Sequence, residues 1–361
     1  MPHLFDSLTL REVTLANRIV VSPMCQYSCA NGLASDWHLV HLGSRAVGGA
    51  GLVFTEAAAV TPGGRISPQD LGIRDDEHVE VFQRIVAFVK AQGSAVGIQI
   101  AHAGRKASMR RPWEELASIS ESHGGWQPIG PTTDSFAAEY KTPRAMNRSD
   151  IAEVIDAFGR AAARARTAGF DVLEIHAAHG YLLHEFLSPL SNTRTDPYGG
   201  RFESRIRLVL DVVDAVRGEW PERLPLFVRI SATDWTPDGW DIEQSVALAK
   251  QLRSRGVDLV DCSSGGNVPG AAIPVGPGYQ VPLSARIRRE AQVPTGAVGL
   301  ITTPSQADQV VRNGDADCVL LARELLRDPY WPLHAARDLG IAATWPAQYL
   351  RAAPAGSLPR S

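Results

Sequence analysis

Eight short apolar runs, rich in β-branched residues, alternate along the chain with segments of helical period. The runs span residues 19–22, 52–56, 96–101, 172–176, 226–230, 259–262, 295–298 and 318–322. The helical segments span about 38–48, 76–92, 149–169, 203–217, 242–255, 284–290, 304–312 and 330–338. Strands that alternate with helices favour a parallel sheet. Eight such units predict an α/β fold closed as a (β/α)8 TIM barrel.

The clearest helical segment is expected to begin at Ser149 and Asp150, with Glu153 in its first turn, and to end at Gly169. An open doubly wound sheet is the rival fold. Its nucleotide fingerprint would follow the first strand, whereas the glycine-rich residues 48–51 precede a strand. The barrel is therefore favoured.

Three segments are predicted to be added to this barrel, which we expect to span 1–361 as one domain. Residues 1–16 have the alternating pattern of a short N-terminal hairpin. The connection 103–148, dense in Pro, Gly, Ser and Trp, is far longer than an ordinary loop, so we predict a capping insertion after the third strand. Residues 340–361 are predicted to form a C-terminal arm.

Composition excludes several classes of protein. The 36 basic and 39 acidic residues are interspersed and give a formal net charge of −3, so no basic patch indicates nucleic acid. Four cysteines in 361 residues are too few for a disulfide scaffold. The first residues lack a signal peptide, and no apolar run reaches membrane-spanning length. We expect a cytoplasmic protein without nucleic-acid or membrane partners.

The residues that follow the fourth apolar run are unusually rich in titratable side chains: His176, His179, Tyr181 and His184. In barrels, reacting groups lie at the carboxyl ends of the strands. The three histidines could bind a metal, as in a metal-dependent TIM-barrel hydrolase. Alternatively, His176 and His179 are neutral donors that polarise a substrate oxygen, with Tyr181 as general acid and His184 as a structural residue.

Arg229, within a predicted strand, and Arg323, after one, suggest positions where an anion binds. A guanidinium in the buried run that contains Arg229 is costly unless an anion meets it. Either a ligand or an acid across the barrel, Glu174 or Glu56, is expected to supply that anion. Gly299 and Arg323 follow the seventh and eighth runs, where barrels commonly bind phosphate.

Motifs along nearly the whole chain resemble the Old Yellow Enzyme family of flavin-dependent ene-reductases, in its bacterial branch with an active-site cysteine. They are LANRIVVSPMCQY at 15–27, TEAAAVTPGGRIS at 55–67, IQIAHAGRKAS at 98–108, HAAHGYLLHEFLSPLSNTRTDPYGG at 176–200, VRIS at 228–231 and LARELLRDPYWP at 321–332. The resemblance implies a TIM barrel with non-covalent FMN and no metal.

The resemblance also implies where FMN would bind. The residues along the flavin would be Ser22, Pro23, Met24, Cys25, Ala57 and Gln99. Arg229 would lie by flavin N1 and stabilise the reduced form. Gly299, Ala322 and Arg323 would bind the phosphate, with Ala322 where the family usually has Gly.

The implied reaction is reduction of an activated C=C bond by NADPH, with NADH possible as hydride donor. His176 and His179 would bind the carbonyl or nitro oxygen of an enone, enal, maleimide or nitro substrate, and Tyr181 would supply the proton. Cys25 would tune the flavin and contact the substrate, and Tyr27 would add a hydrogen bond. The branch forms homodimers or higher homo-oligomers, in which Arg351 would reach a neighbour's site.

The chain departs from the family after the seventh run. Some relatives place a large aromatic residue there, whereas this chain has Ala297, Val298, Gly299 and Leu300. The change implies a wider or reshaped pocket. The poorly matched cap, 103–148, would then set the substrate range.

Overall fold

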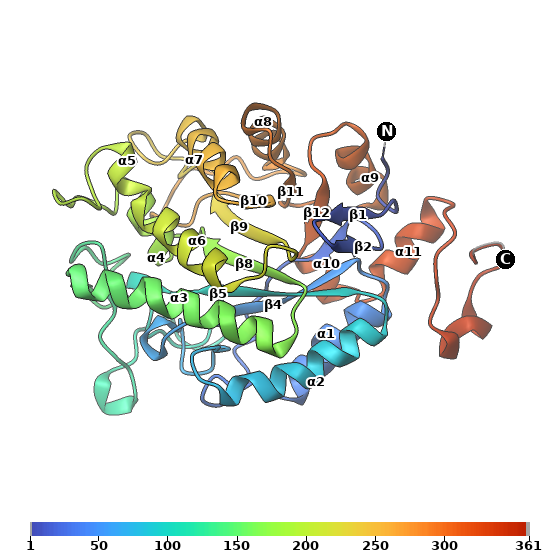
Figure 1. Ribbon diagram of the computed structural model, residues 1–361, viewed down its shortest axis with the longest axis horizontal. Helices are drawn as coiled ribbons and strands as arrows, with labels where there is room; N and C mark the ends of the chain where they lie inside the picture. Colours follow the sequence, from blue (N-terminus) through green and yellow to red (C-terminus); the bar gives the residue numbers. More distant parts are fainter. Residues whose placement is uncertain (1, 359–361) are drawn as a thin grey trace.

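A closed barrel of eight parallel strands forms the centre of the computed structural model, which describes residues 2–358 (Figure 1). In chain order the barrel strands are β3 (Ile19–Val21), β4 (Leu52–Ala59), β5 (Ala95–Ala101), β8 (Val172–Ala177), β9 (Leu226–Ser231), β10 (Leu259–Ser263), β11 (Thr295–Ala297) and β12 (Cys318–Leu321). Strand β12 pairs with β3, which closes the ring. The predicted (β/α)8 TIM barrel is therefore confirmed.

Helices surround the barrel, as the sequence periodicity predicted. The long ones are α1 (Asp36–Val47), α2 (Glu77–Ala91), α3 (Arg148–Ala168), α6 (Arg207–Glu219), α7 (Ile242–Ser254), α8 (Val281–Ala291), α9 (Pro304–Arg312) and α11 (Trp331–Asp338). The predicted helical segment 203–217 is divided into a short α5 (Phe202–Arg205) and α6. Two short helices were not predicted: α4 (Leu182–Leu187) and α10 (Arg323–Arg327). They have at most six residues, too few to show a helical period.

The predicted start of α3 was wrong by one or two residues. Its N-cap is Asn147, whose side chain accepts hydrogen bonds from the backbone N–H groups of Ser149 and Asp150. Asp150 in turn accepts from the Asn147 N–H at 2.7 Å, which completes a capping box. The predicted end at Gly169 is confirmed, with φ of 87° at that residue.

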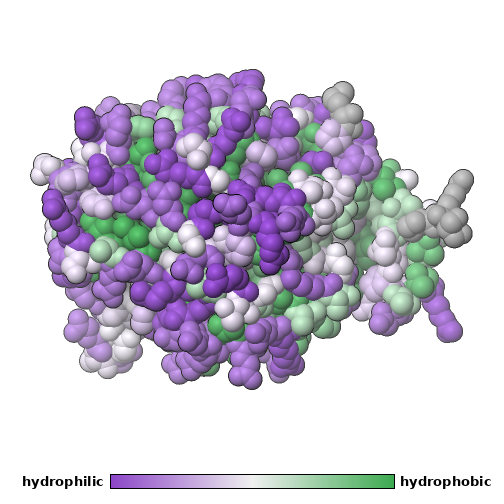
Figure 2. Space-filling view, in the orientation of Figure 1, coloured by the Kyte–Doolittle hydropathy of each residue, from purple (hydrophilic) through white to green (hydrophobic). Residues whose placement is uncertain are grey.

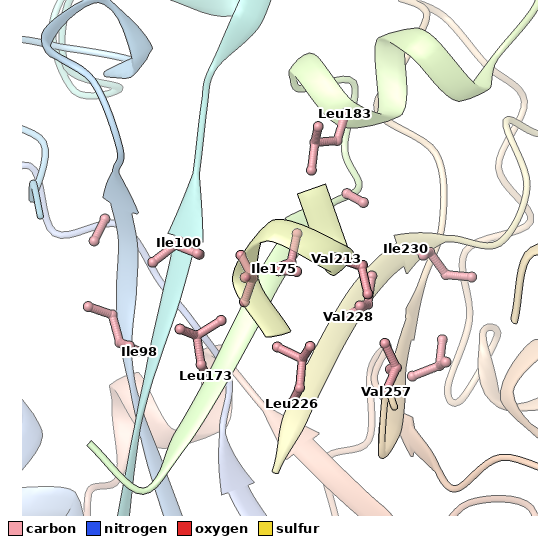
Figure 3. Packing of buried hydrophobic residues seen from close by; sticks show 14 of the residues in the cluster. Ile98, Ile100, Leu173, Ile175, Leu183, Val213, Leu226, Val228, Ile230 and Val257 are labelled. Atoms are coloured by element: carbon pink, nitrogen blue, oxygen red, sulfur yellow. The ribbon is translucent and has the colours of Figure 1, made fainter. Parts of the chain in front are cut away.

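Alternate side chains of each strand face the helices. Figure 3 shows Ile98 and Ile100 of β5, Leu173 and Ile175 of β8, and Leu226, Val228 and Ile230 of β9 in one apolar layer with Val213 of α6. These strand residues are fully buried. Because side chains alternate along a strand, the residues between them face the barrel interior.

The barrel interior is apolar at the amino-terminal ends of its strands. A second cluster contains Val20, Leu52, Phe54, Val172, Phe227, Leu259, Cys318 and Leu320. The predicted hairpin, β1 (Leu8–Leu10) and β2 (Val13–Leu15), adds Leu10 and Leu15 to this cluster. The hairpin therefore closes the amino-terminal end of the barrel with apolar side chains.

Polar side chains replace apolar ones toward the carboxyl ends of the strands. On β8, inward positions run from Val172 through Glu174 to His176. Gln99 of β5 pairs in register with Glu174, whereas Arg229 of β9 pairs with His176 of β8 and with Asp261 of β10. These buried groups form a charged layer between the apolar floor and the barrel mouth, with Arg229 beside His176.

The predicted cap lies between β5 and α3. It contains η2 (Gly104–Lys106), η3 (Glu121–His123) and a parallel pair, β6 (Ile129–Gly130) and β7 (Arg144–Ala145). A further turn, η1 (Pro62–Gly64), follows β4. The C-terminal arm carries η4 (Ala347–Ala352) and lies with α11 on the hairpin side, away from the cap (Figure 1).

The outer surface is largely hydrophilic on the face that Figure 2 shows, with more apolar areas toward the C-terminal arm. Among the described residues, no helix combines the length and the apolar character needed to cross a membrane. The division into one domain, a cap at 103–148 and an arm at 340–361 stays a prediction, and residues 359–361 of that arm lie outside the described range.

We expect Phe227→Ala to lower the free energy of unfolding by about 3–5 kcal/mol, because it opens a cavity in the apolar floor. The Phe227 side chain is 1% exposed, and its ring centroid lies 5.9 Å from that of Phe54. Val40→Ala, at a position 67% exposed on α1, is the control and should stay within about 0.5 kcal/mol. Urea titrations followed by circular dichroism measure both; equal, small effects would contradict a packed floor.

Candidate active site

Three side chains predicted to do chemistry meet at the carboxyl end of β8. The ring centroid of His176 lies 5.1 Å from that of His179 and 5.3 Å from that of Tyr181. The chain turns sharply here, with φ of 60° at His179 and 69° at Gly180. Two groups hold the turn: the His179 N–H donates to Ser231 Oγ at 2.9 Å, and Lys106 Nζ donates to the His179 carbonyl at 2.8 Å.

Both histidines are neutral at ordinary pH. Burial and, next, the nearby charge of Arg229 lower the pKa of His176 and of His179 well below the usual value. His179 Nε2 lies 2.6 Å from Ser263 Oγ, whereas His176 Nδ1 has no hydrogen-bond partner within residues 2–358. A neutral imidazole with an unpaired nitrogen is suited to binding an uncharged polar group.

His184 lies apart from this pair and has a structural role, as expected. Its Nδ1 accepts a hydrogen bond from the Gly180 N–H at 2.9 Å, and its Nε2 lies 3.0 Å from Asp234 Oδ1. Within the described chain, the only three-residue group with metal-ligand spacing is Asp75, Glu77 and His78. The metal-binding interpretation of the histidines therefore has no geometric support.

Arg229 finds its anion in Asp261, which the sequence reasoning missed. Arg229 Nε lies 3.0 Å from Asp261 Oδ2, although without the angle of a hydrogen bond, and Nη1 donates to Ser22 Oγ at 3.1 Å. The two acids suggested as partners were wrong: Glu56 lies 3.0 Å from His38, and Glu174 accepts from Gln99. The alternative, a ligand as anion, stays a prediction. The reason is register, since Arg229 and Asp261 are directly opposed on adjacent parallel strands.

The segment after β3 brings Ser22, Cys25 and Tyr27 to the same end of the barrel. Glu56 fixes it by accepting from the Gln26 N–H at 2.9 Å. Burial raises the pKa of the Cys25 thiol and that of the Tyr27 phenol, so both stay protonated. Tyr27 has φ of 51°. Its ring meets Trp113 of the cap edge-on, with centroids 5.8 Å apart.

A narrow cavity lies beside His176 and Tyr181. His176, Tyr181, Ala57 and Asp70 line it together with five other residues. Burial raises the pKa of the Asp70 carboxyl to about 7. Asp70 and Lys106 were not predicted as site residues. Lys106 Nζ lies 5.6 Å from the centroid of the Tyr181 ring. Lys106 lies in the motif at 98–108, and this motif could have identified it as a candidate site residue.

A larger cavity of about 300 Å³ opens beside the histidines, above β11 and β12. Its lining includes Ser263, Gln280, Gly299, Ala322 and Arg323. Gly299 has φ of 116°, and a Cβ there would lie 2.7 Å from Gln280 Nε2. Glycine is therefore required at this wall. Backbone groups at a glycine and an arginine fork suit a phosphate, so the residues fit a phosphate-bearing cofactor.

Ser263 lines the larger cavity and also contacts His179, so it lies between that cavity and the histidine pair. The structure thus places the predicted catalytic and phosphate residues at the same end of the barrel. Arg351 is the exception. It is exposed in η4, on the arm at the opposite side of the molecule, and does not reach the site of its own chain (Figure 1).

Comparison with known proteins supports one family. Residues 3–340 match the model of the NADH:flavin oxidoreductase / NADH oxidase family. The chain is 51% identical over 350 residues to an NADPH dehydrogenase of Geobacillus thermodenitrificans, covering 96% of this chain and 98% of that protein. It is 48% identical over 350 residues to an NADPH dehydrogenase of Bacillus subtilis, with the same coverage of 96% and 98%.

Solved structures agree. Morphinone reductase in complex with tetrahydroNAD superposes with a TM-score of 0.78 and 25% identity, over 100% of this chain and 95% of the other. A 2-naphthoyl-CoA reductase complex gives a TM-score of 0.86 and 25% identity, over 93% of this chain and 52% of the other. The chain therefore belongs to the NADH:flavin oxidoreductase / NADH oxidase family, the Old Yellow Enzyme family that its motifs resemble, and is an oxidoreductase.

Proposed function

We propose that the protein is an FMN-dependent NADPH oxidoreductase that reduces the activated C=C bond of α,β-unsaturated carbonyl or nitro compounds. The observation that carries this proposal is that two neutral histidines and a half-buried tyrosine lie close to a cavity lined by Gly299 and Arg323, with Ser263 between His179 and that cavity. The names of the relatives support NADPH as the hydride donor.

The proposed cofactor contacts extend from the larger cavity to the end of β3. Gly299, Ala322 and Arg323 would bind the FMN phosphate. Arg229 would meet the N1 side of the ring. The remaining contacts would be Ser22, Pro23, Met24, Cys25, Ala57 and Gln99. When bound, FMN would accept a hydride from NADPH and deliver it to the substrate carbon.

His176 and His179 would bind the substrate oxygen, and their neutral state suits this role. A hydrogen bond from each imidazole withdraws electron density and makes the β-carbon electrophilic. His179 would exchange Ser263 Oγ for the substrate oxygen, whereas His176 Nδ1 has no partner to give up within the described residues. Enones, enals, maleimides and nitroalkenes all offer an oxygen of this kind.

Tyr181 would protonate the α-carbon. Burial raises the pKa of its phenol well above the usual value, so the proton stays in place until a carbanion-like centre forms next to it. The protonated Cys25 thiol and the Tyr27 phenol would contact the substrate from the β3 side. Arg351 would act in the site of a second copy in a homodimer or higher homo-oligomer, since it lies far from its own.

We expect the purified protein to be yellow and to release FMN on heating, and Arg323→Ala to weaken FMN binding. Loss of a charge-assisted hydrogen bond to phosphate costs about 1.5–3 kcal/mol, or roughly 10–100-fold in affinity. Arg289→Ala, at an exposed position on α8, is the control. Fluorescence titration of the apoprotein measures both. A colourless protein that cannot be reconstituted with FMN would refute the proposed function.

We expect Tyr181→Phe to slow alkene reduction by about 10²–10⁴-fold while flavin reduction by NADPH is unchanged, because only the second step needs its proton. Stopped-flow absorbance separates the two half-reactions, with cyclohexenone as the alkene. Tyr198→Phe, which removes a hydroxyl bonded to Asp211 on α6, should affect neither. Equal losses in both half-reactions would assign Tyr181 a positioning role instead.

A further inference from the structure

The charged layer of the barrel holds two carboxyl groups and one guanidinium. Glu174, Arg229 and Asp261 are 0%, 6% and 0% exposed. Arg229 Nε lies 3.0 Å from Asp261 Oδ2, and Gln99 donates to Glu174 Oε1 at 2.7 Å. If both acids were ionised, this layer would carry an uncompensated negative charge away from water. Such a charge is costly, so one of the acids is expected to hold a proton.

Geometry indicates which acid is protonated. Asp261 has Arg229 beside it and is the favoured carboxylate. Glu174 has only a neutral amide donor, at Oε1. Glu174 Oε2 and both Asp261 oxygens lack a hydrogen-bond partner within residues 2–358, so the nearby Arg229 charge is what favours Asp261 as the ionised acid. Burial, as the largest cause, raises the pKa of both acids, and Arg229 opposes the shift in each. In the resting state, Glu174 is therefore neutral and Asp261 balances Arg229.

The other groups around the pair add no compensating charge. The neighbours are Gln99 on β5, neutral His176 on β8, Cys262 beside Asp261, and Cys318 on β12. Burial raises the pKa of both thiols well above the usual value, so they are uncharged. Arg229 is thus the cation on which the balance of this layer depends.

Arg229 connects this layer with the proposed flavin position. Its Nε faces Asp261, and its Nη1 donates to Ser22 Oγ, at the strand end where the isoalloxazine edge would lie. A hydride brings two electrons and one proton to the isoalloxazine, which adds one negative charge there. Arg229 can balance one negative charge, and Asp261 would then be an uncompensated buried carboxylate.

We propose that Asp261 takes up one proton from solvent when the bound flavin accepts a hydride. The hydride leaves NADPH, which becomes NADP⁺, and bonds to the flavin. The solvent proton bonds to the Asp261 carboxylate, and Arg229 becomes the counter-ion of the flavin. Asp261 is thereby a positioning residue that acts through Arg229. This inference rests on the proposed FMN function.

The test is the midpoint potential of the bound flavin as a function of pH. With two electrons, each proton taken up contributes about 30 mV per pH unit. We expect about 60 mV per pH unit near neutral pH for the native holoenzyme, because one proton goes to the flavin and one to Asp261. Asp261→Asn should show about 30 mV per pH unit. Glu174→Gln, which mimics an acid that is already neutral, should keep the steeper slope.

The matched control is Asp317→Asn, which alters an Asp–Arg pair with Arg288 outside the proposed flavin contacts. It should keep the native slope. If Asp261→Asn does not fold, proton uptake by the native holoenzyme is read together with the absorbance of the reduced flavin. On reduction by NADPH in weakly buffered solution with an indicator dye, one proton should disappear from solvent for each flavin while the reduced flavin keeps the spectrum of its anionic form; the spectrum of the neutral reduced form would place that proton on the flavin.

Several outcomes would overturn the inference. They are a native slope of about 30 mV per pH unit at all pH values, no proton uptake, or a steep slope that persists in Asp261→Asn. The last would place the second proton on the flavin itself. Failure of the proposed function is a different result, because the protein would then bind no FMN or would not be reduced by NADPH.

Discussion

The ion pair between Arg229 and Asp261 is the interaction on which the site depends. A guanidinium inside a barrel needs an anion, and parallel register places a carboxylate on the next strand directly opposite it. The pair leaves part of the guanidinium turned toward Ser22 and the barrel mouth. Arg229 can therefore face a ligand at the barrel mouth. When the proposed flavin is oxidised and uncharged, Asp261 would still balance the charge of Arg229.

Most of the fold could be predicted because its elements repeat a local pattern. The eight strands are continuous apolar runs, and the long helices have enough turns to show a period. The short helices α4 and α10 could not be predicted in this way. They form because the chain must turn within the barrel mouth, where Leu182 and Leu325 pack into the core. Tertiary contacts, and not periodicity, determine them.

The residues of the candidate site also fall into those that the local sequence pattern predicted and those that depend on tertiary contacts. His176 lies near the carboxyl end of β8, and Tyr181, Gly299 and Arg323 follow strands, so their meeting at one end of the barrel could be predicted from order alone. Asp261 could not, because it lies within a strand and its partner is remote in sequence. Ser263 was also missed, although it directly follows the predicted run 259–262, because its contact with His179 is visible only in the structure. Residues of this kind can be found only when strand register is known, since alternation gives the face of a side chain but not its neighbour.

Closure of the ring has a consequence for how the chain folds. Strand β12 pairs with β3 at Val319 and Ile19, so residues near both ends of the barrel must meet before the sheet is complete. The hairpin that covers the barrel floor also packs against residues from β12. Contacts so distant in sequence are slow to form. During synthesis, the edge of β3 that pairs with β12 therefore stays unpaired until nearly the entire barrel has left the ribosome.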